Sequence, residues 1–140
     1  MMKLLEGKVS VITGASRGIG AAIALKLAEQ GSHIAFTYVS ESSAEKAMQL
    51  EQQLQRKGVE AKAFQSNAAD YKQCETLVNE IIKEFETIDI CVNNAGISKD
   101  NLLLRLPPEQ WDEVMNTNVK SVYNMTRQVI KPMMKAKKGS

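Results

Sequence analysis

The chain has 140 residues, enough for one domain that buries about two-thirds of its surface around a single core, and its formal net charge is +2. No apolar run approaches transmembrane length, and the first seven residues lack the apolar run of a signal peptide, so we expect a cytoplasmic protein that binds no membrane. Cys74 and Cys91 lie far apart without zinc-binding spacing, which predicts two free thiols and no metal site.

A short apolar run at residues 9–12 predicts the first strand, and a glycine-rich turn follows it directly. In a dinucleotide-binding loop, Gly14 would permit the tight turn, Gly18 would let a pyrophosphate approach the backbone, and Gly20 would let the next helix pack close to its strand. The helix N-terminus would then hold the phosphates. Taken by itself, the glycine pattern could also be a chance turn.

The helix after this loop shows apolar residues at every fourth position, and Gly31 is expected to end it. Its stripe of Ile19, Ile23 and Leu27 is expected to face the sheet. Further strands are predicted at residues 33–38, 61–65 and 88–92. The only histidine, His33, begins the second strand and is interpreted as structural, because a lone histidine lacks an orienting partner.

Three more helices alternate with these strands, so the pattern predicts an α/β fold with a parallel sheet. One begins at a capping-box sequence from Ser42 to Glu45 and ends near Gly58, and the next begins at a second box, Asp70 with Gln73. The second of these has the clearest apolar stripe: Cys74, Leu77, Val78, Ile81, Ile82 and Phe85.

The last helical pattern starts at Glu109 and continues until Pro132 is expected to interrupt it. Asparagines at 116 and 118 make a break or a functional bend plausible there, because asparagine is a poor helix former. After Glu113 every charged residue is basic, which favours a solvated helix end over contact with an acidic partner, and no nucleic-acid partner is expected.

The end of the second strand bears on the choice of cofactor. An acidic residue there would bind the ribose hydroxyls of NAD and repel the 2′-phosphate of NADP, but this strand ends in Tyr38, Val39 and Ser40. Arg17, inside the glycine loop, offers a planar cation to a 2′-phosphate. The residues therefore favour NADPH over NADH, and Glu41 keeps NADH open as the alternative.

Asn93, Asn94, Ala95 and Gly96 follow the fourth strand, where open α/β sheets bind ligands, although Asn and Gly are also common in plain turns. Together with the loop at residues 13–20, the segments 93–103 and 116–119 and Trp111, this stretch resembles the 3-oxoacyl-(acyl-carrier-protein) reductases of the short-chain dehydrogenase/reductase family. The resemblance extends from Gly7 to the end of the chain, and residues 96–103 are its most specific part.

This resemblance implies a Rossmann-like doubly wound parallel sheet of four β-α units with strand order 3-2-1-4, truncated before the fifth strand. Residues 1–140 would form the N-terminal portion of a single NADP-binding domain. The implied reaction is NADPH-dependent reduction of a 3-oxoacyl group on acyl carrier protein to the 3-hydroxyacyl form, in fatty-acid synthesis. The implied assembly is a homotetramer formed partly through the last helix, and Lys135, Lys137 and Lys138 are candidate contacts to the carrier protein.

The resemblance also assigns roles to individual residues. Asn118 matches the family's active-site asparagine, which helps hold a water in the proton relay. The positions that match the family's cofactor contacts divide into phosphate, 2′-phosphate, adenine and nicotinamide groups. These are Gly14, Ser16, Arg17, Gly18, Ile19 and Gly20 for the phosphates, Ser40 for the 2′-phosphate, Asn67 and Ala68 for adenine, and Asn94, Ala95 and Gly96 for the ribose and nicotinamide.

One family element is absent from the 140 residues. The chemistry requires a Tyr-x-x-x-Lys pair, in which the lysine lowers the pKa of the tyrosine that donates the proton, and none of the three tyrosines has a lysine four residues later. We therefore expect this N-terminal half to be inactive alone. The alternatives are a short-chain reductase of another small ketone and a non-catalytic dinucleotide-binding or oligomerisation module.

Overall fold

The computed structural model describes residues 2–96 and 102–140. Four parallel strands form one sheet in the order β3-β2-β1-β4, as predicted. β1 is Val9–Ile12, β2 is His33–Tyr38 and β3 is Ala61–Gln65, each with the predicted bounds. β4 is Ile90–Val92, so it begins two residues later than predicted, although the Asp89 N–H already donates to the Val9 carbonyl.

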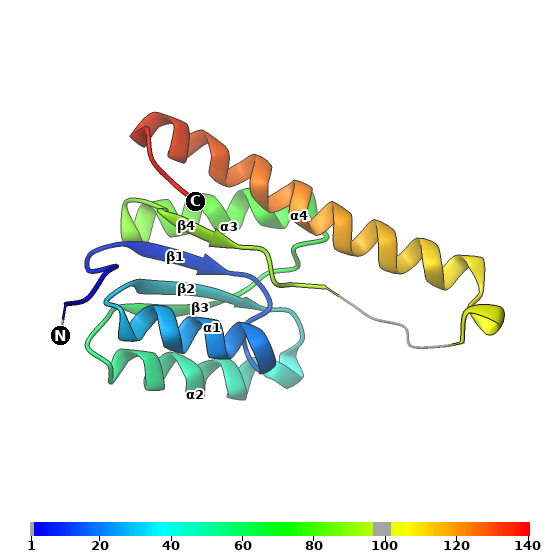
Figure 1. Cartoon of the computed structure of the whole chain (residues 1–140), viewed down its shortest axis with the longest axis horizontal. Coiled ribbons are helices and arrows are strands. Elements are labelled where there is room, and N and C mark those ends of the chain that lie inside the picture. Colours follow the sequence, from blue (N-terminus) through cyan, green and yellow to red (C-terminus); the bar gives the residue numbers. More distant parts are fainter. Residues whose placement is uncertain (1, 97–101) are drawn as a thin grey trace.

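In the described residues, three α-helices connect the strands, a fourth follows β4, and together they cover both faces of the sheet (Figure 1). α1 is Gly18–Glu29 and α2 is Ala44–Gln55, and both lie on one face. α3 is Tyr71–Phe85 and α4 is Pro108–Ala136, and both lie on the other face. Two short 3-10 helices, Glu41–Ser43 (η1) and Leu103–Arg105 (η2), precede α2 and α4.

Side chains of the central strands alternate between two hydrophobic clusters, because successive residues of a strand point to opposite faces. On β1, Ile12 packs with the cluster under α1 and α2, and Val11 packs with the cluster under α3 and α4. On β2, Phe36 and Ala35 divide in the same way. This doubly covered sheet agrees with the predicted fold class.

The predicted buried face of α1 is confirmed for Ile23 and Leu27, which pack against the cluster under α1 and α2, and is wrong for Ile19, which is 75% exposed. Gly20, Ala24 and Ala28 form the buried stripe. Small residues let α1 lie close to the sheet, and this close approach outweighs the apolar gain of turning Ile19 inward. Gly31 adopts a left-handed φ of +95° just beyond the helix, which confirms the predicted end.

The two predicted capping boxes have different outcomes. Asp70 caps α3 by accepting a hydrogen bond from the Gln73 N–H at 3.0 Å. The predicted box at α2 does not form: Ser43 is the N-cap residue and makes no capping bond with its side chain. In the η1 turn, Ser42 Oγ and Ser43 Oγ lie 2.9 and 3.1 Å from Ser40 Oγ. The two hydroxyl groups therefore hydrogen-bond to Ser40 and not to the start of the helix.

α4 corrects two expectations, since it is continuous through residues 116–118 and continues past Pro132 to Ala136. Proline removes one intrahelical hydrogen bond, but Met125, Val129 and Met133 pack into the same core on both sides of Pro132. Tertiary packing therefore carries the helix across the proline. Despite its length, neither α4 nor any other helix of the described residues is apolar enough to cross a membrane.

The outer side of β4 is paired with the last residue of the chain. Cys91 N–H donates to the Ser140 carbonyl and Ser140 N–H donates to the Asp89 carbonyl, both at 2.9 Å. These two bonds are the pattern of a parallel strand neighbour. Ser140 thus lies beside β4 and pairs with its backbone at Asp89 and Cys91.

Candidate functional site

The loop between β1 and α1 has the backbone geometry that the glycine pattern predicts. Gly14 and Gly18 adopt left-handed φ angles of +65° and +63°. A Cβ atom on Gly14 would lie 3.0 Å from the Ala95 Cα, so the loop and the segment after β4 approach each other too closely for a side chain. β2 holds the loop in place, because the Gly14 N–H donates to Thr37 Oγ1 and the Ala15 N–H donates to the Thr37 carbonyl, both at 2.9 Å.

A second set of hydrogen bonds ties this loop to the segment after β4. Thr13 Oγ1 accepts from the backbone N–H groups of Asn94 and Ala95 at 3.1 and 3.0 Å. Asn94 Nδ2 donates to the Gly14 carbonyl at 2.9 Å. The asparagine side chain therefore fixes the relative position of two loops that are 80 residues apart in the sequence.

The start of α1 lacks a local cap. Its N-cap residue, Arg17, makes no capping hydrogen bond with its side chain, and the first turn contains no acidic residue. The first N–H groups of a helix have no intrahelical acceptors, so this end of α1 remains available to an anion from outside. Its chemistry fits a phosphate group better than a neutral ligand.

These loops enclose a cavity of about 660 Å³ at the carboxyl ends of the four strands. Each strand contributes the residues that follow it directly, which is the usual ligand position of an open α/β sheet. The lining residues come from the glycine loop, the ends of β2, β3 and β4, and α4: Gly14, Ser16, Arg17, Gly18, Tyr38, Val39, Ser40, Ser43, Asn67, Ala68, Ala69, Asn94, Ala95, Gly96, Glu113, Thr117 and Ser121.

All but two of the predicted cofactor-binding residues line this cavity, and the exceptions are Ile19 and Gly20. Ile19 lies on the exposed side of α1. Gly20 lies behind the loop, where a Cβ atom would be 2.5 Å from Asn94 Nδ2 and 2.7 Å from the Gly14 carbonyl oxygen. Gly20 therefore permits the close packing that the loop requires.

The predicted active-site residue Asn118 lies beside the cavity rather than in its lining. A Cβ atom on Gly96 would lie 2.9 Å from Asn118 Oδ1, so the middle of α4 touches the segment after β4. The most specific stretch of the resemblance, residues 96–103, falls mainly at positions 97–101, which lie outside the described residues. Asn118 therefore adjoins the cavity at Gly96.

Sequence reasoning missed the residues that hold the site together. Thr13 follows β1 directly and Thr37 lies on β2; both are buried, and neither position gives a signal in the sequence that its hydroxyl group binds another loop. Thr117 and Ser121 reach the cavity from α4, at a spacing of one helical turn that could have indicated a shared face. The predicted structural role of His33 is confirmed, since His33 Nδ1 accepts from the Glu60 N–H at 3.0 Å.

The two cysteines are free thiols packed between the sheet and α3. Burial raises the pKa of Cys74 to about 11, and the nearby charge of Asp70 adds to this. Burial also raises the pKa of Cys91 to about 11, with a smaller contribution from Cys74. Both thiols are thus protonated at neutral pH, which makes them poor nucleophiles. Within the described ranges, no three His, Cys, Asp or Glu side chains could hold a metal ion together.

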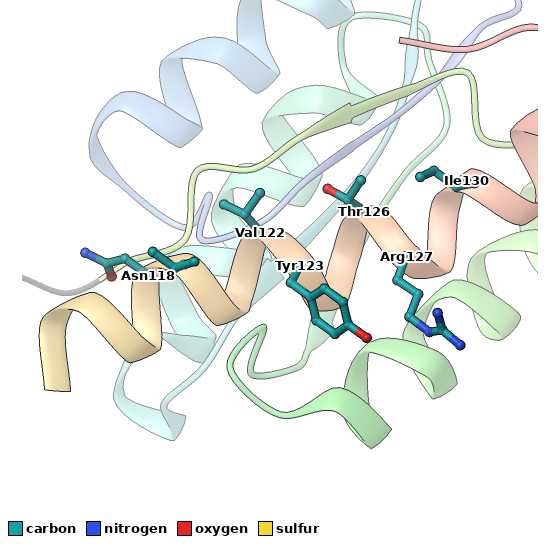
Figure 2. Close-up of a pocket in the computed structure, with 7 residues that line it drawn as sticks. Asn118, Val122, Tyr123, Thr126, Arg127 and Ile130 are labelled. Atoms are coloured by element: carbon teal, nitrogen blue, oxygen red, sulfur yellow. The ribbon is translucent and has the colours of Figure 1, made fainter. Parts of the chain in front are cut away.

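A second hollow, of about 760 Å³, lies along α4 and is mostly apolar. Figure 2 shows the side chains that line it, which follow one another along the helix: Asn118, Val119, Val122, Tyr123, Thr126, Arg127 and Ile130. Arg127 Nε donates to the Tyr71 hydroxyl at 2.9 Å, so this side of α4 is also tied to α3. Asn93, just after β4, donates from Nδ2 to Thr126 Oγ1 of this groove at 3.3 Å, but among the described residues the groove has no glycine in its lining.

The sequence profile of the short chain dehydrogenase family matches residues 8–140. The chain belongs to the short-chain dehydrogenase family. This membership confirms the resemblance seen in the glycine loop and in the Asn-Asn-Ala-Gly segment. Two curated relatives are 3-oxoacyl-(acyl-carrier-protein) reductases FabG, from Staphylococcus aureus (strain N315) and Vibrio cholerae.

The Staphylococcus aureus relative is 41% identical over 133 residues, which cover 95% of this chain and 53% of the relative. The Vibrio cholerae relative is 42% identical over 135 residues, which cover 96% of this chain and 53% of the relative. The chain therefore spans about half the length of the curated relatives it matches.

Two solved structures share the fold of this chain. An NAD+-bound xylitol dehydrogenase superimposes with a TM-score of 0.91 at 29% identity, covering 98% of this chain and 52% of that protein. A blue fluorescent protein from a metagenomic library, in complex with NADPH, gives a TM-score of 0.83 at 41% identity, covering 91% and 51%. Both nicotinamide dinucleotides thus occur among the structural neighbours.

Proposed function

We propose that this chain carries the cofactor-binding half of an NADPH-dependent 3-oxoacyl-(acyl-carrier-protein) reductase of fatty-acid synthesis. The observation that carries the proposal is the cavity at the strand ends, where the glycine loop meets Asn94, Ala95 and Gly96. The site fits a dinucleotide because two glycines keep the loop open and the uncapped start of α1 suits a pyrophosphate.

Residues at the end of β2 support NADPH over NADH. Arg17, Ser40 and Ser43 line the cavity and offer a cation and two hydroxyl groups to a 2′-phosphate. Glu41, which would repel that phosphate, lies in the exposed η1 turn between the two serines and outside the cavity lining. The NADPH-bound neighbour is also more similar to this chain in sequence than the NAD+-bound one, at 41% against 29% identity.

The substrate class follows from the curated relatives, whose names specify 3-oxoacyl groups on acyl carrier protein. The exposed lysines at the end of α4 are suitable contacts for an acidic carrier protein, and Lys135 and Lys137 are the freer candidates. Lys138 lies 3.5 Å from the Asp89 carboxylate and is already engaged in an ion pair. We further propose that the whole protein is a tetramer that uses the exposed apolar side of α4.

In this proposal, the residues that line the cavity bind and orient the dinucleotide. Asn118, beside Gly96, supports the proton relay. NADPH, when bound, supplies a hydride. The proton donor of the reaction would come from a Tyr-x-x-x-Lys pair, which the 140 residues do not contain. The 140 residues alone are therefore proposed to bind the cofactor weakly and to reduce no substrate.

Replacing Arg17 tests the cofactor assignment. In Arg17→Ala, we expect the affinity for NADPH to fall by about 10- to 100-fold, because a charge-assisted contact to the 2′-phosphate is lost. The affinity for NADH should remain within about twofold, because NADH lacks that phosphate. Fluorescence titration with each dinucleotide measures both, and Arg56→Ala, an exposed arginine at the end of α2, is the matched control. Equal losses for NADPH and NADH would contradict the assignment.

A second candidate, a reductase of another small ketone, is favoured by the close superposition on xylitol dehydrogenase. A protein that joins this chain to a downstream Tyr-x-x-x-Lys segment separates the two. We expect such a protein to reduce 3-oxoacyl thioesters linked to acyl carrier protein. Turnover of small ketones with no activity on any 3-oxoacyl thioester would instead support the second candidate.

A further inference from the structure

Asn124, in the core under α4, has a buried side-chain amide to which the proposed function assigns no role. Asn124 is fully buried beside Met125, on the face of α4 that packs against the sheet and α3. Its Nδ2 donates to the Ala68 carbonyl at 2.9 Å, and its Oδ1 is buried without a hydrogen-bond partner among the described residues. Burying an amide with an unsatisfied oxygen costs stability. A polar side chain at this core position therefore indicates a role for its hydrogen bond to Ala68.

That bond holds one peptide group at the edge of the cavity. The Ala68 carbonyl also accepts from Cys74 Sγ at 3.4 Å, so two interior side chains fix its direction. The other end of the same peptide, the Ala69 N–H, donates to Asn67 Oδ1 at 2.9 Å. Because the C=O and N–H of a trans peptide point in opposite directions, the interior bonds of Ala68 orient the Ala69 N–H toward Asn67.

Asn67 is thereby oriented as a donor. Its own N–H donates to Gln73 Oε1 at 2.8 Å, and its side-chain oxygen accepts from Ala69, so its NH2 group is the part left to offer to a ligand. Asn67, Ala68 and Ala69 all line the cavity. Adenine presents acceptor ring nitrogens and a donor amine on its edges, which match an amide NH2 and nearby backbone groups.

We propose that Asn124 is a positioning residue for recognition of the purine, and that it acts through the Ala68–Ala69 peptide on Asn67. This inference rests on the proposed function, because it requires an adenine dinucleotide in the cavity. Asn124 lies on α4 behind the cavity lining and touches no ligand itself. Its effect is on which purine edge the site accepts, and not on the phosphates held by the glycine loop.

The test compares NADPH with its hypoxanthine analogue, which differs only at the amine-bearing edge of the purine. We expect the unmodified chain to bind NADPH about tenfold more tightly than the analogue, the effect of one or two hydrogen bonds. In Asn124→Leu, which has the same branching and no donor, the affinity for NADPH should fall and the preference should shrink to about twofold or less. Fluorescence titration of both ligands gives the ratio directly.

Val129→Ala is the matched control, because it weakens the same core and removes no hydrogen bond to Ala68, and it should lower thermal stability while the purine preference stays unchanged. Asn124→Ala serves if the leucine variant does not fold, since it also lacks the NH2 donor and cannot overpack the core, and circular dichroism checks that it is folded. A preference that survives in the folded Asn124 variants, or that is absent in the unmodified chain, overturns the inference while NADPH binding still supports the proposed function. Failure of the unmodified chain to bind any dinucleotide would count against the proposed function itself.

Discussion

Gly20 shows how a single position links the fold to the site. Its backbone angles are ordinary for a helix, but a Cβ atom would meet the Gly14 carbonyl oxygen at 2.7 Å and the Ala15 Cα at 2.9 Å. These are backbone atoms, so no side-chain rotation relieves the contact. Gly18 is different, because its φ of +63° requires glycine while nothing lies within 4 Å of the missing Cβ.

These two environments predict that an alanine at position 20 destabilises the protein more than an alanine at position 18. Gly20→Ala should lower the free energy of unfolding by about 3 kcal/mol, since overpacking forces α1 away from the loop. Gly18→Ala should cost only about 1 to 2 kcal/mol, the strain of a left-handed alanine. Urea unfolding of both variants measures the difference. Equal losses would mean that α1 does not pack against the loop as described.

The two buried thiols predict how stability changes in alkali. Folding raises the pKa of Cys74 and Cys91 from 9.0 to about 11, chiefly through burial, so above pH 9 the unfolded chain releases these protons before the folded chain does. The thiols therefore favour the folded state below pH 9, and this contribution is lost as the pH rises toward 11.

A double variant, Cys74→Ala with Cys91→Ala, isolates this contribution from other groups that titrate in alkali. Its free energy of unfolding should decline less between pH 8.5 and pH 10.5 than that of the unmodified chain. Urea titrations at several pH values provide the comparison. Parallel declines in the two proteins would show that the thiols ionise equally easily in the folded and unfolded states.

At the scale of elements, the predictable parts were those governed by local patterns. The strands stand out as short apolar runs, and Asp70 caps α3 through a contact between neighbours in sequence. The exposure of Ile19 on α1 and the passage of α4 across Pro132 were not predictable in this way, because both depend on how closely other elements approach. The capping box at α2 failed for a local reason, since Ser40, two and three residues earlier in the chain, competes for the hydroxyl groups of Ser42 and Ser43.

The outer edge of β3 is covered by side chains of α2, which the periodicity of the sequence does not predict. The Ala63 N–H, which points away from β2, donates to Glu51 Oε2 at 2.8 Å, and the Ala61 carbonyl accepts from Gln55 Nε2 at 3.0 Å. Side chains of α2 thus occupy groups that another strand could otherwise pair with.

Glu51→Ala should expose this edge. We expect a loss of about 1 kcal/mol in the free energy of unfolding and increased self-association at high concentration. Glu45→Ala removes the same charge from an exposed position of the same helix and is the control. Sedimentation and urea unfolding report both effects. Association that is equal in the two variants would show that net charge, and not the covered edge, keeps the chains apart.

At the scale of the molecule, the chain separates a polar cavity at the strand ends from an apolar side of α4. The first half of α4 extends beyond the sheet (Figure 1), and Trp111, Val119 and Tyr123 are each more than half exposed. Ten of the twelve predicted cofactor-binding residues line the cavity from loops that follow strand ends, whereas Glu113, Thr117 and Ser121 line it from α4 and were not predicted. The sequence also did not predict Thr13, Thr37 or Asn124, whose contacts join segments distant in the chain.

The most direct test of the central claim is a map of backbone amide signals by nuclear magnetic resonance during titration with NADPH. The account predicts that signals shift in three segments that line the cavity, at residues 14–18, 67–69 and 94–96, while Tyr123, Arg127 and Ile130 along the α4 groove change little. Shifts concentrated along the α4 groove, or no shifts at millimolar NADPH, would contradict the assignment of the cavity as a dinucleotide site.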